Sequence, residues 1–428
     1  MNNTSTNITT TRKSFSKNYW IVILMEFFER GSYYGMMSIL SVYMTDQLNF
    51  SKESVGIIKS TIQPLLYILP ILSGAIGERF GYKNTLTFAF IFLGIGYFLT
   101  SQTTEYITVF ASLIIMAFGA GAFKPMISGT IARETDESNS TLGFGIYYWS
   151  INLGAFLFPL ILVPYIKNNF GWQYVMLVSA IATAAMLIPT YLVYKEPKKP
   201  ENTKTIAEVL KGAVLVLTDV KFIGLIVIYS GFWILYFQQF DSVLWYVQKY
   251  VDATTLNNFI NGIFSSVGIN LQWKFDVEHV TVINAGTIIL LQILVSNIVK
   301  NTKALPTMIT GITMGTIGMA ILAIDTSIWV FILGIVIFSI GEMTAHPKYI
   351  SYVGLIAPED KKALYLGYAF LYGVLGSFIG GILGANLYVH FVDNLNQPRT
   401  LWIIFSMIGF VTIIGLLLYN KFLAPKKY

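Results

Sequence analysis

The sequence has no cysteine, few histidines and little charge. The absence of cysteine from its 428 residues excludes disulfides, thiol catalysis and thiolate metal sites. The three histidines, His279, His346 and His390, are scattered along the chain, so we expect no metal centre. Charged residues make up 12% of the chain and hydrophobic residues 55%, whereas soluble proteins carry about twice that charged fraction. The composition is that of a membrane protein.

Continuous apolar runs of roughly 20 residues, the length that crosses a bilayer core, recur along the whole sequence. They predict an all-α polytopic membrane protein. About twelve spans are expected, near residues 19–46, 54–78, 84–101, 106–131, 143–166, 173–194, 222–249, 280–299, 304–324, 328–356, 363–390 and 399–421.

A polar, lysine-rich segment, residues 195–221, divides the predicted spans into two groups of six. It is too short for an extra pair of spans, which would need roughly 40 apolar residues. Lysine and arginine gather in this segment and in the other connections on its side, so the positive-inside rule places both termini in the cytoplasm. We expect a multi-pass protein of the cell (inner) membrane. Its parts would be a cytoplasmic tail (1–18), a six-helix bundle (19–194), a cytoplasmic linker (195–221), a second six-helix bundle (222–421) and a cytoplasmic tail (422–428).

A weak internal repeat supports two equivalent halves. The segments "GAFKPMIS" and "TAHPKYIS" occupy matching places in the fourth and tenth spans, with Lys124-Pro125 in one and His346-Pro347 in the other. Parallel repeats of six helices build transporters of the major-facilitator type, which bind substrate at the midplane between the halves.

The first predicted span, "IVILMEFFERGSYYGMM", contains Glu26, Glu29 and Arg30. A charge at the bilayer centre costs about 2.5–3.5 kcal/mol and usually faces the protein interior with a partner. Glu29 and Arg30 follow Glu26 by three and four residues, so all three can share one helix face, which Tyr33 and Tyr34 extend by a turn. The sequence therefore predicts that this helix lines an interior site.

Further polar and aromatic residues are expected at the same depth, given the helix rise of about 1.5 Å per residue. They are Tyr67, Lys124, Asn152, Trp233 and Glu342. Together they predict one central polar cavity. Its carboxylates (Glu26, Glu29, Glu342) outnumber its cations (Arg30, Lys124) by one. A buried carboxylate without a cation tends to bind a proton, as a proton-coupled carrier requires; a structural ion-pair network is the alternative.

Six segments carry a family resemblance. "EFFERGSYYG" resembles the first-span signature of the proton-dependent oligopeptide transporter family, a branch of the major facilitator superfamily. The segments "GAGAFKPMIS", "GFGIYYWSINLGAFLFP", "GFWILYFQQ" and "GEMTAHPKYISYVGLIAP" resemble its motifs in the fourth, fifth, seventh and tenth spans, and "GAIGERFGYKN" resembles the superfamily's loop between spans two and three.

The resemblance implies roles for the charged layer. Proton binding would be coupled to movement through Glu26, Glu29, Arg30 and Glu342. Lys124 and Arg30 would hold a peptide carboxylate, and Glu342 with Asn152 and Asn284 would hold the amino end. Tyr34, Tyr67 and Trp233 would shape side-chain pockets, and the loop residues Glu78, Arg79 and Lys83 would stabilise one carrier conformation. The expected coupling ion is the proton, with no cofactor and no metal.

Two positions depart from the family pattern. Met37 stands where the family usually has a second arginine, and Phe237 or Gln238 where it has a glutamate that pairs with that arginine across the halves. Asp241, one turn further out, is predicted to be a charge at the outer rim, with replacement of the glutamate as the alternative. Lys59, nearer a helix end, is predicted to snorkel to the interface.

The function expected from these features is proton-driven import of di- and tripeptides by alternating access. The alternatives are transport or export of another zwitterion or organic anion on the same scaffold, and a transport-inactive sensor. No G-x-x-x-x-G-K-[ST] loop is present and no catalytic constellation is apparent, so we do not expect an enzyme. The expected partners are small peptides or similar zwitterions and the lipid bilayer, with no nucleic acid, and the protein is expected to be a monomer.

Overall fold

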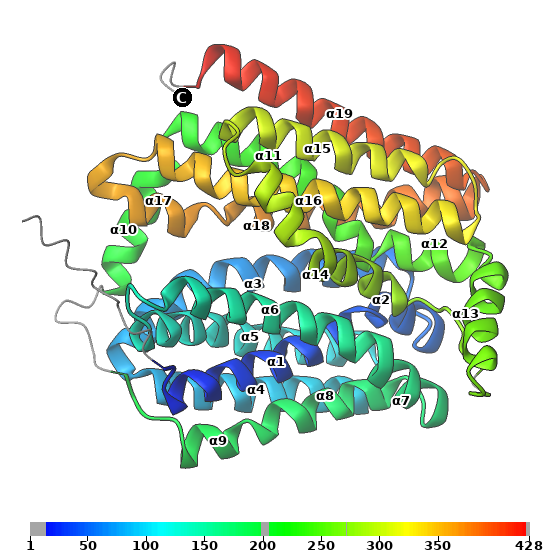
Figure 1. Cartoon of the computed structure of the whole chain (residues 1–428), viewed down its shortest axis with the longest axis horizontal. Coiled ribbons are helices and arrows are strands. Elements are labelled where there is room, and N and C mark those ends of the chain that lie inside the picture. The colour runs from blue at the N-terminus through cyan, green and yellow to red at the C-terminus, as the bar shows by residue number, and fades with distance from the viewer. Residues whose placement is uncertain (1–13, 198–204, 271, 425–428) are drawn as a thin grey trace, which may run out of the picture.

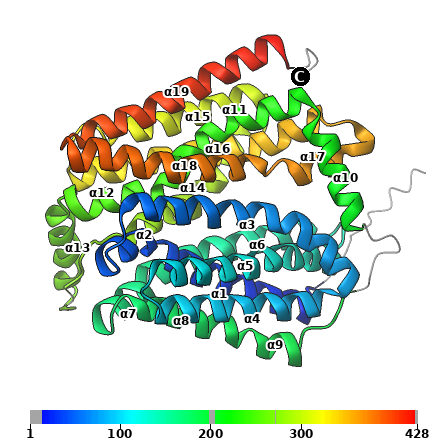
Figure 2. The same ribbon diagram turned by 180° about the vertical axis from the view of Figure 1, so that it is seen from behind.

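The computed structural model describes residues 14–197, 205–270 and 272–424 (Figures 1 and 2). The predicted tails and the predicted linker lie partly outside the described residues. The helices before the linker are α1 (Lys17–Met37), α2 (Leu40–Val42), η1 (Tyr43–Gln47), α3 (Lys52–Phe80), α4 (Tyr82–Gln102), α5 (Tyr106–Glu134), α6 (Ser140–Leu157), η2 (Phe158–Leu162), α7 (Val163–Asn169), α8 (Gln173–Ala185) and α9 (Leu187–Leu192). Those that follow are α10 (Ile206–Leu217), α11 (Val220–Phe237), η3 (Gln238–Phe240), α12 (Ser242–Tyr250), α13 (Thr254–Ser266), α14 (His279–Val299), α15 (Ala304–Ile321), α16 (Ile328–Ile356), η4 (Glu359–Lys361), α17 (Lys362–Tyr368), α18 (Leu371–Leu387), η5 (Tyr388–Asn394) and α19 (Pro398–Phe422).

Eleven helical segments of the described chain are long and apolar enough to cross a membrane. The remaining long helix of the first bundle is α1, which is less apolar because Glu26, Glu29 and Arg30 interrupt it. With α1 included, the segments correspond to the twelve predicted spans, ten of them to within a few residues. The predicted spans 19–46 and 222–249 end nine residues beyond Met37 and Phe240, where the chain continues in shorter helices. The predicted all-α polytopic fold is therefore confirmed.

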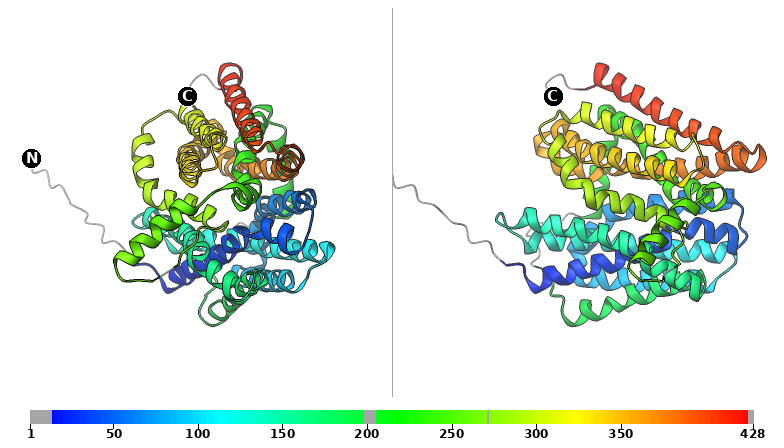
Figure 3. Two further views of the ribbon diagram at one scale, coloured as in Figure 1. Left: turned by 90° about the vertical axis from the view of Figure 1, so that its right-hand side faces the viewer. Right: turned by 45° about the vertical axis from the view of Figure 1, so that its right-hand side comes forward.

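The spans form two bundles, one before and one after the linker (Figure 3). In the first bundle α1 packs on α6 and α8, and α4 packs on α5; in the second, α15 packs on α16 and α19. The bundles meet along two helix pairs, α3 with α18 and α6 with α14. The predicted two-half architecture is confirmed, and any ligand between the bundles lies between these two contacts.

Two short helices run outside the bundles and were not predicted. At one end of the molecule α10 contacts α3, α11 and α17, and so bridges the bundles (Figure 1). A capping box explains where it begins, because Glu208 accepts from the backbone N–H of Thr205 at 2.7 Å and the Thr205 hydroxyl accepts from that of Glu208 at 3.2 Å. The helix α13 lies at the opposite end. We call these the α10 end and the α13 end.

Toward the α13 end, α3 and α18 approach so closely that only small residues fit between them. A Cβ atom on Gly56 would lie 2.7 Å from the Cβ of Ala385 and 2.7 Å from the carbonyl oxygen of Gly381. Further along α3, a Cβ atom on Gly74 would lie 3.9 Å from Pro125, an ordinary contact distance. The contact between the bundles is thus sterically tight at one end of α3.

This difference predicts opposite effects for two glycine substitutions in one helix. Gly56→Ala is expected to destabilise the protein by about 1–3 kcal/mol, because the added methyl group forces the bundles apart. The matched control Gly74→Ala is expected to stabilise it by about 0.5–1 kcal/mol through helix propensity. Thermal unfolding of the two purified variants measures both effects, and equal melting temperatures would contradict the tight contact.

Candidate functional site

The charges of α1 form a compact group inside the first bundle. Arg30 donates from Nη2 to Oε1 of Glu29 at 2.6 Å, and its Nε donates to the other oxygen of the same carboxylate. The Arg30 guanidinium also lies over the ring of Tyr33, 4.9 Å from its centroid. Arg30 is therefore bound in a two-point pair with Glu29, a strong and directional arrangement.

Glu26 is fully buried one turn away from Arg30. Its Oε1 lies 3.8 Å from Arg30 Nε, and neither of its oxygens has a hydrogen-bond partner within the described chain. The burial of a carboxylate without hydrogen bonds is unfavourable. Hydrogen bonds and ion pairs therefore stabilise the charge of Glu26 less than that of Glu29, the other acid on α1.

Lys124 reaches the same region from α5, one residue before Pro125 in the middle of the helix. Its side chain is exposed to a cavity, and no hydrogen bond or ion pair of its ammonium is found within the described chain. It is close enough to Arg30, Glu26 and Glu29 for its charge to interact with theirs. Lys124 therefore offers an accessible cation, whereas the guanidinium of Arg30 is already occupied.

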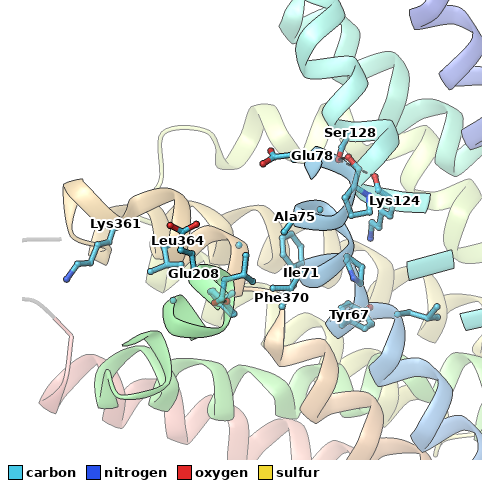
Figure 4. A pocket seen from close by; sticks show the side chains of 18 of the residues that line it. Tyr67, Ile71, Ala75, Glu78, Lys124, Ser128, Glu208, Lys361, Leu364 and Phe370 are labelled. Carbon is cyan, nitrogen blue, oxygen red and sulfur yellow. Dashed lines mark hydrogen bonds between the residues drawn. The ribbon is translucent and has the colours of Figure 1, made fainter. Parts of the chain in front are cut away.

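The cavity has a volume of about 1420 Å³ and lies between the two bundles. Lys124 and Tyr67 stand at its inner end, and Glu208, Lys361 and Leu364 stand across it toward the α10 end (Figure 4). The first bundle contributes residues of α3, α5 and α6, and the second bundle contributes residues of α17 and the segment before α18. The cavity is large enough for a small organic molecule.

A recess of about 80 Å³ lies beyond the inner end of this cavity. Tyr67, Leu66 and Lys124 line both spaces, so the recess is a narrow continuation of the cavity. Its other lining residues are Arg30, Tyr33, Tyr34, Gln63, Ala120, Tyr236, Phe237 and Phe240. Four predicted substrate residues, Arg30, Tyr34, Tyr67 and Lys124, thus gather around one space.

The other four predicted substrate residues do not line either cavity. Asn152 is buried and donates to the carbonyl of Tyr148 in its own helix at 2.9 Å. Trp233 packs against Tyr372, with ring centroids 4.5 Å apart. In the second bundle, Asn284 donates to Oε2 of Glu342 at 3.1 Å. Of the residues predicted to surround one cavity, Arg30 and Lys124 thus line it, whereas the Glu342–Asn284 pair of the second bundle does not.

The predicted conformational loop lies at the α10 end. Glu78 lines the cavity, with its Oε1 3.9 Å from Arg133 Nη2, and Lys83 donates to the carbonyl of Tyr191 at 2.9 Å. Arg79 is exposed beside Phe80, 5.6 Å from its ring centroid. A contact that was not predicted is made by Glu196, whose carboxylate accepts from the backbone N–H groups of Tyr82 and Lys83 at 2.6 and 2.8 Å. An acid at the first turn of a helix is favourable. The sequence does not indicate this contact because Glu196 is far along the chain from Tyr82 and Lys83.

Two predictions about the outer charges are wrong. Lys59 does not snorkel: it is fully buried, and its ammonium lies 3.1 Å from Oδ1 of Asp241. Asp241 is not a rim charge but is 2% exposed, and it also accepts from the hydroxyl of Ser41 at 2.7 Å. The structure fits the alternative prediction, that Asp241 replaces the expected glutamate, because Asp241 forms an ion pair between the two bundles. The Lys59 ammonium also lies 3.7 Å from the sulfur of Met37.

Further ion pairs join the bundles near the α13 end. Lys52 pairs with Asp393 at 2.6 Å, and Lys167 pairs with Asp276 and Glu278 at 2.7 Å each. In each pair the lysine belongs to the first bundle and the acid to the second. Together with the pair of Lys59 and Asp241, these ion pairs close the α13 end of the molecule. The cavity extends toward the α10 end.

Comparisons with known proteins give a family and a fold. The family model described as "Major Facilitator Superfamily" matches residues 22–273 and 253–427. Dipeptide and tripeptide permease B of Salmonella typhimurium strain LT2 is 25% identical over 460 residues, covering 92% of both chains. The permease of the same name from Aliivibrio fischeri strain MJ11 is 32% identical over 175 residues, which cover 40% of this chain and 35% of that protein.

Solved structures share the fold at low identity. A POT family transporter in complex with 5-aminolevulinic acid superimposes with a TM-score of 0.76 at 22% identity, covering 95% of this chain and 96% of the other. A nucleoside transporter superimposes with a TM-score of 0.77 at 15% identity, covering 94% and 99%. At this level of sequence identity the structural similarity shows only a common fold. The ligand of this protein must therefore be inferred from its own site.

Proposed function

Because the chain belongs to the Major Facilitator Superfamily, we propose that it is a proton-coupled transporter that carries di- and tripeptides by alternating access. The observation that carries this proposal is the cavity between the bundles, with the accessible ammonium of Lys124 at its inner end. The terminal carboxylate of a peptide is an anion that this ammonium can bind, and the aromatic lining tolerates varied side chains.

Orientation follows from the charged connections. The cavity opens at the α10 end, near Lys83, Arg133 and Lys361, where the positive-inside rule expects the cytoplasm. The conformation is then inward-open, with the ion pairs at the α13 end closing the outer side. We propose a multi-pass protein of the cell membrane with both termini in the cytoplasm, working as a monomer.

Proton coupling is proposed from Glu26. Its carboxylate is fully buried, has no hydrogen bond within the described chain, and shares Arg30 with Glu29. Protonation of Glu26 removes its charge, whereas the Glu29–Arg30 pair keeps its own. Binding of a substrate carboxylate at the nearby Lys124 changes the same electrostatic balance, which is the physical basis for linking the two events.

Uptake by reconstituted protein tests the proposal. Proteoliposomes with an alkaline lumen are expected to accumulate a labelled dipeptide above its external concentration, and a protonophore should abolish the accumulation. Facilitated dipeptide uptake that does not depend on the proton gradient would refute proton coupling but would still support peptide transport. The other candidate function is a carrier of a different zwitterion. It is considered because a transporter of similar fold was solved with 5-aminolevulinic acid. Saturable uptake of 5-aminolevulinic acid without uptake of any dipeptide would favour this candidate.

A further inference from the structure

The recess contains an amide side chain without any partner. Gln63 of α3 is 1% exposed and lines the recess together with Arg30 and Lys124. Neither its Oε1 nor its Nε2 has a hydrogen-bond partner within the described chain. Buried amides nearly always have partners, because each unmet donor or acceptor is unfavourable. Within the described chain, Gln63 thus presents a donor and an acceptor without protein partners to the recess.

The position of Gln63 on α3 fits this role. Lys59, Gln63 and Tyr67 are spaced four residues apart, so they share one helix face. Lys59 is held by Asp241 and Tyr67 lines both cavities. Gln63 thus lies between the closed contact of the bundles and the open cavity. A recess of about 80 Å³ holds only a few waters and so accommodates part of a ligand rather than a whole peptide.

The hydrogen-bonding groups of the Gln63 amide limit the kinds of ligand that can satisfy it. A carboxylate can accept from Nε2 but leaves Oε1 without a donor, since it has no N–H. A peptide unit offers both a carbonyl oxygen and an N–H. Lys124 at the mouth of the recess supplies the cation for a terminal carboxylate, and the peptide unit preceding that carboxylate then comes near Gln63.

We propose that Gln63 recognises the peptide bond of the substrate, with Oε1 accepting from its N–H, and thereby selects peptides over single amino acids and organic anions. This inference rests on the proposed function, because it assigns a specificity-determining residue within the same site. A polar site discriminates strongly against an analogue that lacks the matching hydrogen-bonding group, because its own buried groups are then left unpaired.

The test compares a dipeptide with the ester analogue in which oxygen replaces the amide N–H, using calorimetric titration of purified protein. Wild type is expected to bind the dipeptide about tenfold more tightly than the ester, which corresponds to roughly 1.4 kcal/mol. Gln63→Met keeps the length of the side chain and removes both polar groups. It is expected to bind the dipeptide about tenfold more weakly than wild type and to bind the two ligands alike.

A matched control separates recognition from packing. Gln239 is also buried, with an unpaired Nε2, but lines neither cavity. Gln239→Met is expected to keep the preference for the dipeptide over the ester. Gln63→Met should melt no earlier than wild type without ligand, since it removes an unpaired group. If Gln63→Met keeps the wild-type preference, water satisfies the amide and the inference is wrong; if wild type binds no dipeptide, the proposed function fails as well.

Discussion

Lys124→Ala is expected to weaken dipeptide binding by about 100-fold. Truncation of one partner of a desolvated charge pair costs about 2–5 kcal/mol, and each 1.4 kcal/mol is tenfold in affinity. The effect should be this large because no other cation in the cavity can replace Lys124. Arg30 is held at two points by Glu29, and Lys361 stands at the mouth of the cavity near the α10 end. Calorimetric titration measures the loss.

Two controls make this result specific. Lys361→Ala removes a lysine from the same cavity at a solvated position, where a charge contributes about 0–1 kcal/mol, so it should change affinity by only a few-fold. The C-terminal amide of the same dipeptide lacks the carboxylate. Wild type should bind it about as weakly as Lys124→Ala binds the acid, and the variant should bind the acid and the amide alike. Retention of wild-type affinity by Lys124→Ala would mean that the carboxylate binds elsewhere.

The sequence predicts the fold well because hydrophobic length and charge position are local properties. Apolar runs give the spans, and the three charges of α1 give a helix that faces the interior. The lysine before Pro125 in α5 could likewise be placed near mid-membrane by counting residues from the helix end. Depth can be estimated along one helix without knowledge of its neighbours, and these residues do lie close together.

Counting residues along one helix does not show which neighbouring helix each of its faces packs against. Lys59 is seven residues into α3, about 10 Å by helix rise, a depth from which a lysine can snorkel. It is buried because its partner Asp241, 182 positions away, belongs to the facing bundle. Trp233 and Glu342 are predicted from helix rise to lie at the depth of the cavity, but Trp233 packs on Tyr372, Glu342 accepts from Asn284, and neither lines the cavity.

The departure from the family pattern has the same origin. Met37 stands where the family pattern predicts an arginine, and Phe237 or Gln238 stands where it predicts a glutamate, which by sequence alone suggests that a pair between the bundles is absent. In the structure Lys59 lies against the sulfur of Met37, and Asp241 follows Phe237 by one turn. The cation comes from α3, and the acid comes from the chain segment that joins α11 to α12. This chain therefore has an ion pair between the bundles, and neither of its charges stands at a position that the family pattern predicts.

Lys59→Met is expected to open the α13 end of the protein. Asp241 would keep only its bond from Ser41 and remain buried without a cation. Loss of one partner of a buried ion pair costs about 3–5 kcal/mol, and about 5.5 kcal/mol reverses a two-state equilibrium from 1:99 to 99:1. Because the two charges belong to different bundles, separation of the bundles hydrates Asp241 and relieves most of that energy. The population should therefore shift strongly toward the outward-open state.

Spin-label distances measure this shift without background, since the chain has no cysteine. Labels on Gln47→Cys and Asn394→Cys report the outer side, and labels on Glu137→Cys and Glu359→Cys report the α10 end. Lys59→Met should lengthen the first distance and shorten the second. Lys52→Met, which breaks the more exposed pair with Asp393, should leave both distances nearly unchanged.

The double variant Lys59→Met with Asp241→Asn separates gating from simple destabilisation. It removes both charges, so the closed contact no longer buries an unpaired ion, and the distances should return toward those of wild type. A role in stability alone predicts a lower melting temperature for Lys59→Met with unchanged distances. Rescue of the distances by the second substitution, in contrast, requires that the energy of this one pair sets which end of the protein is open.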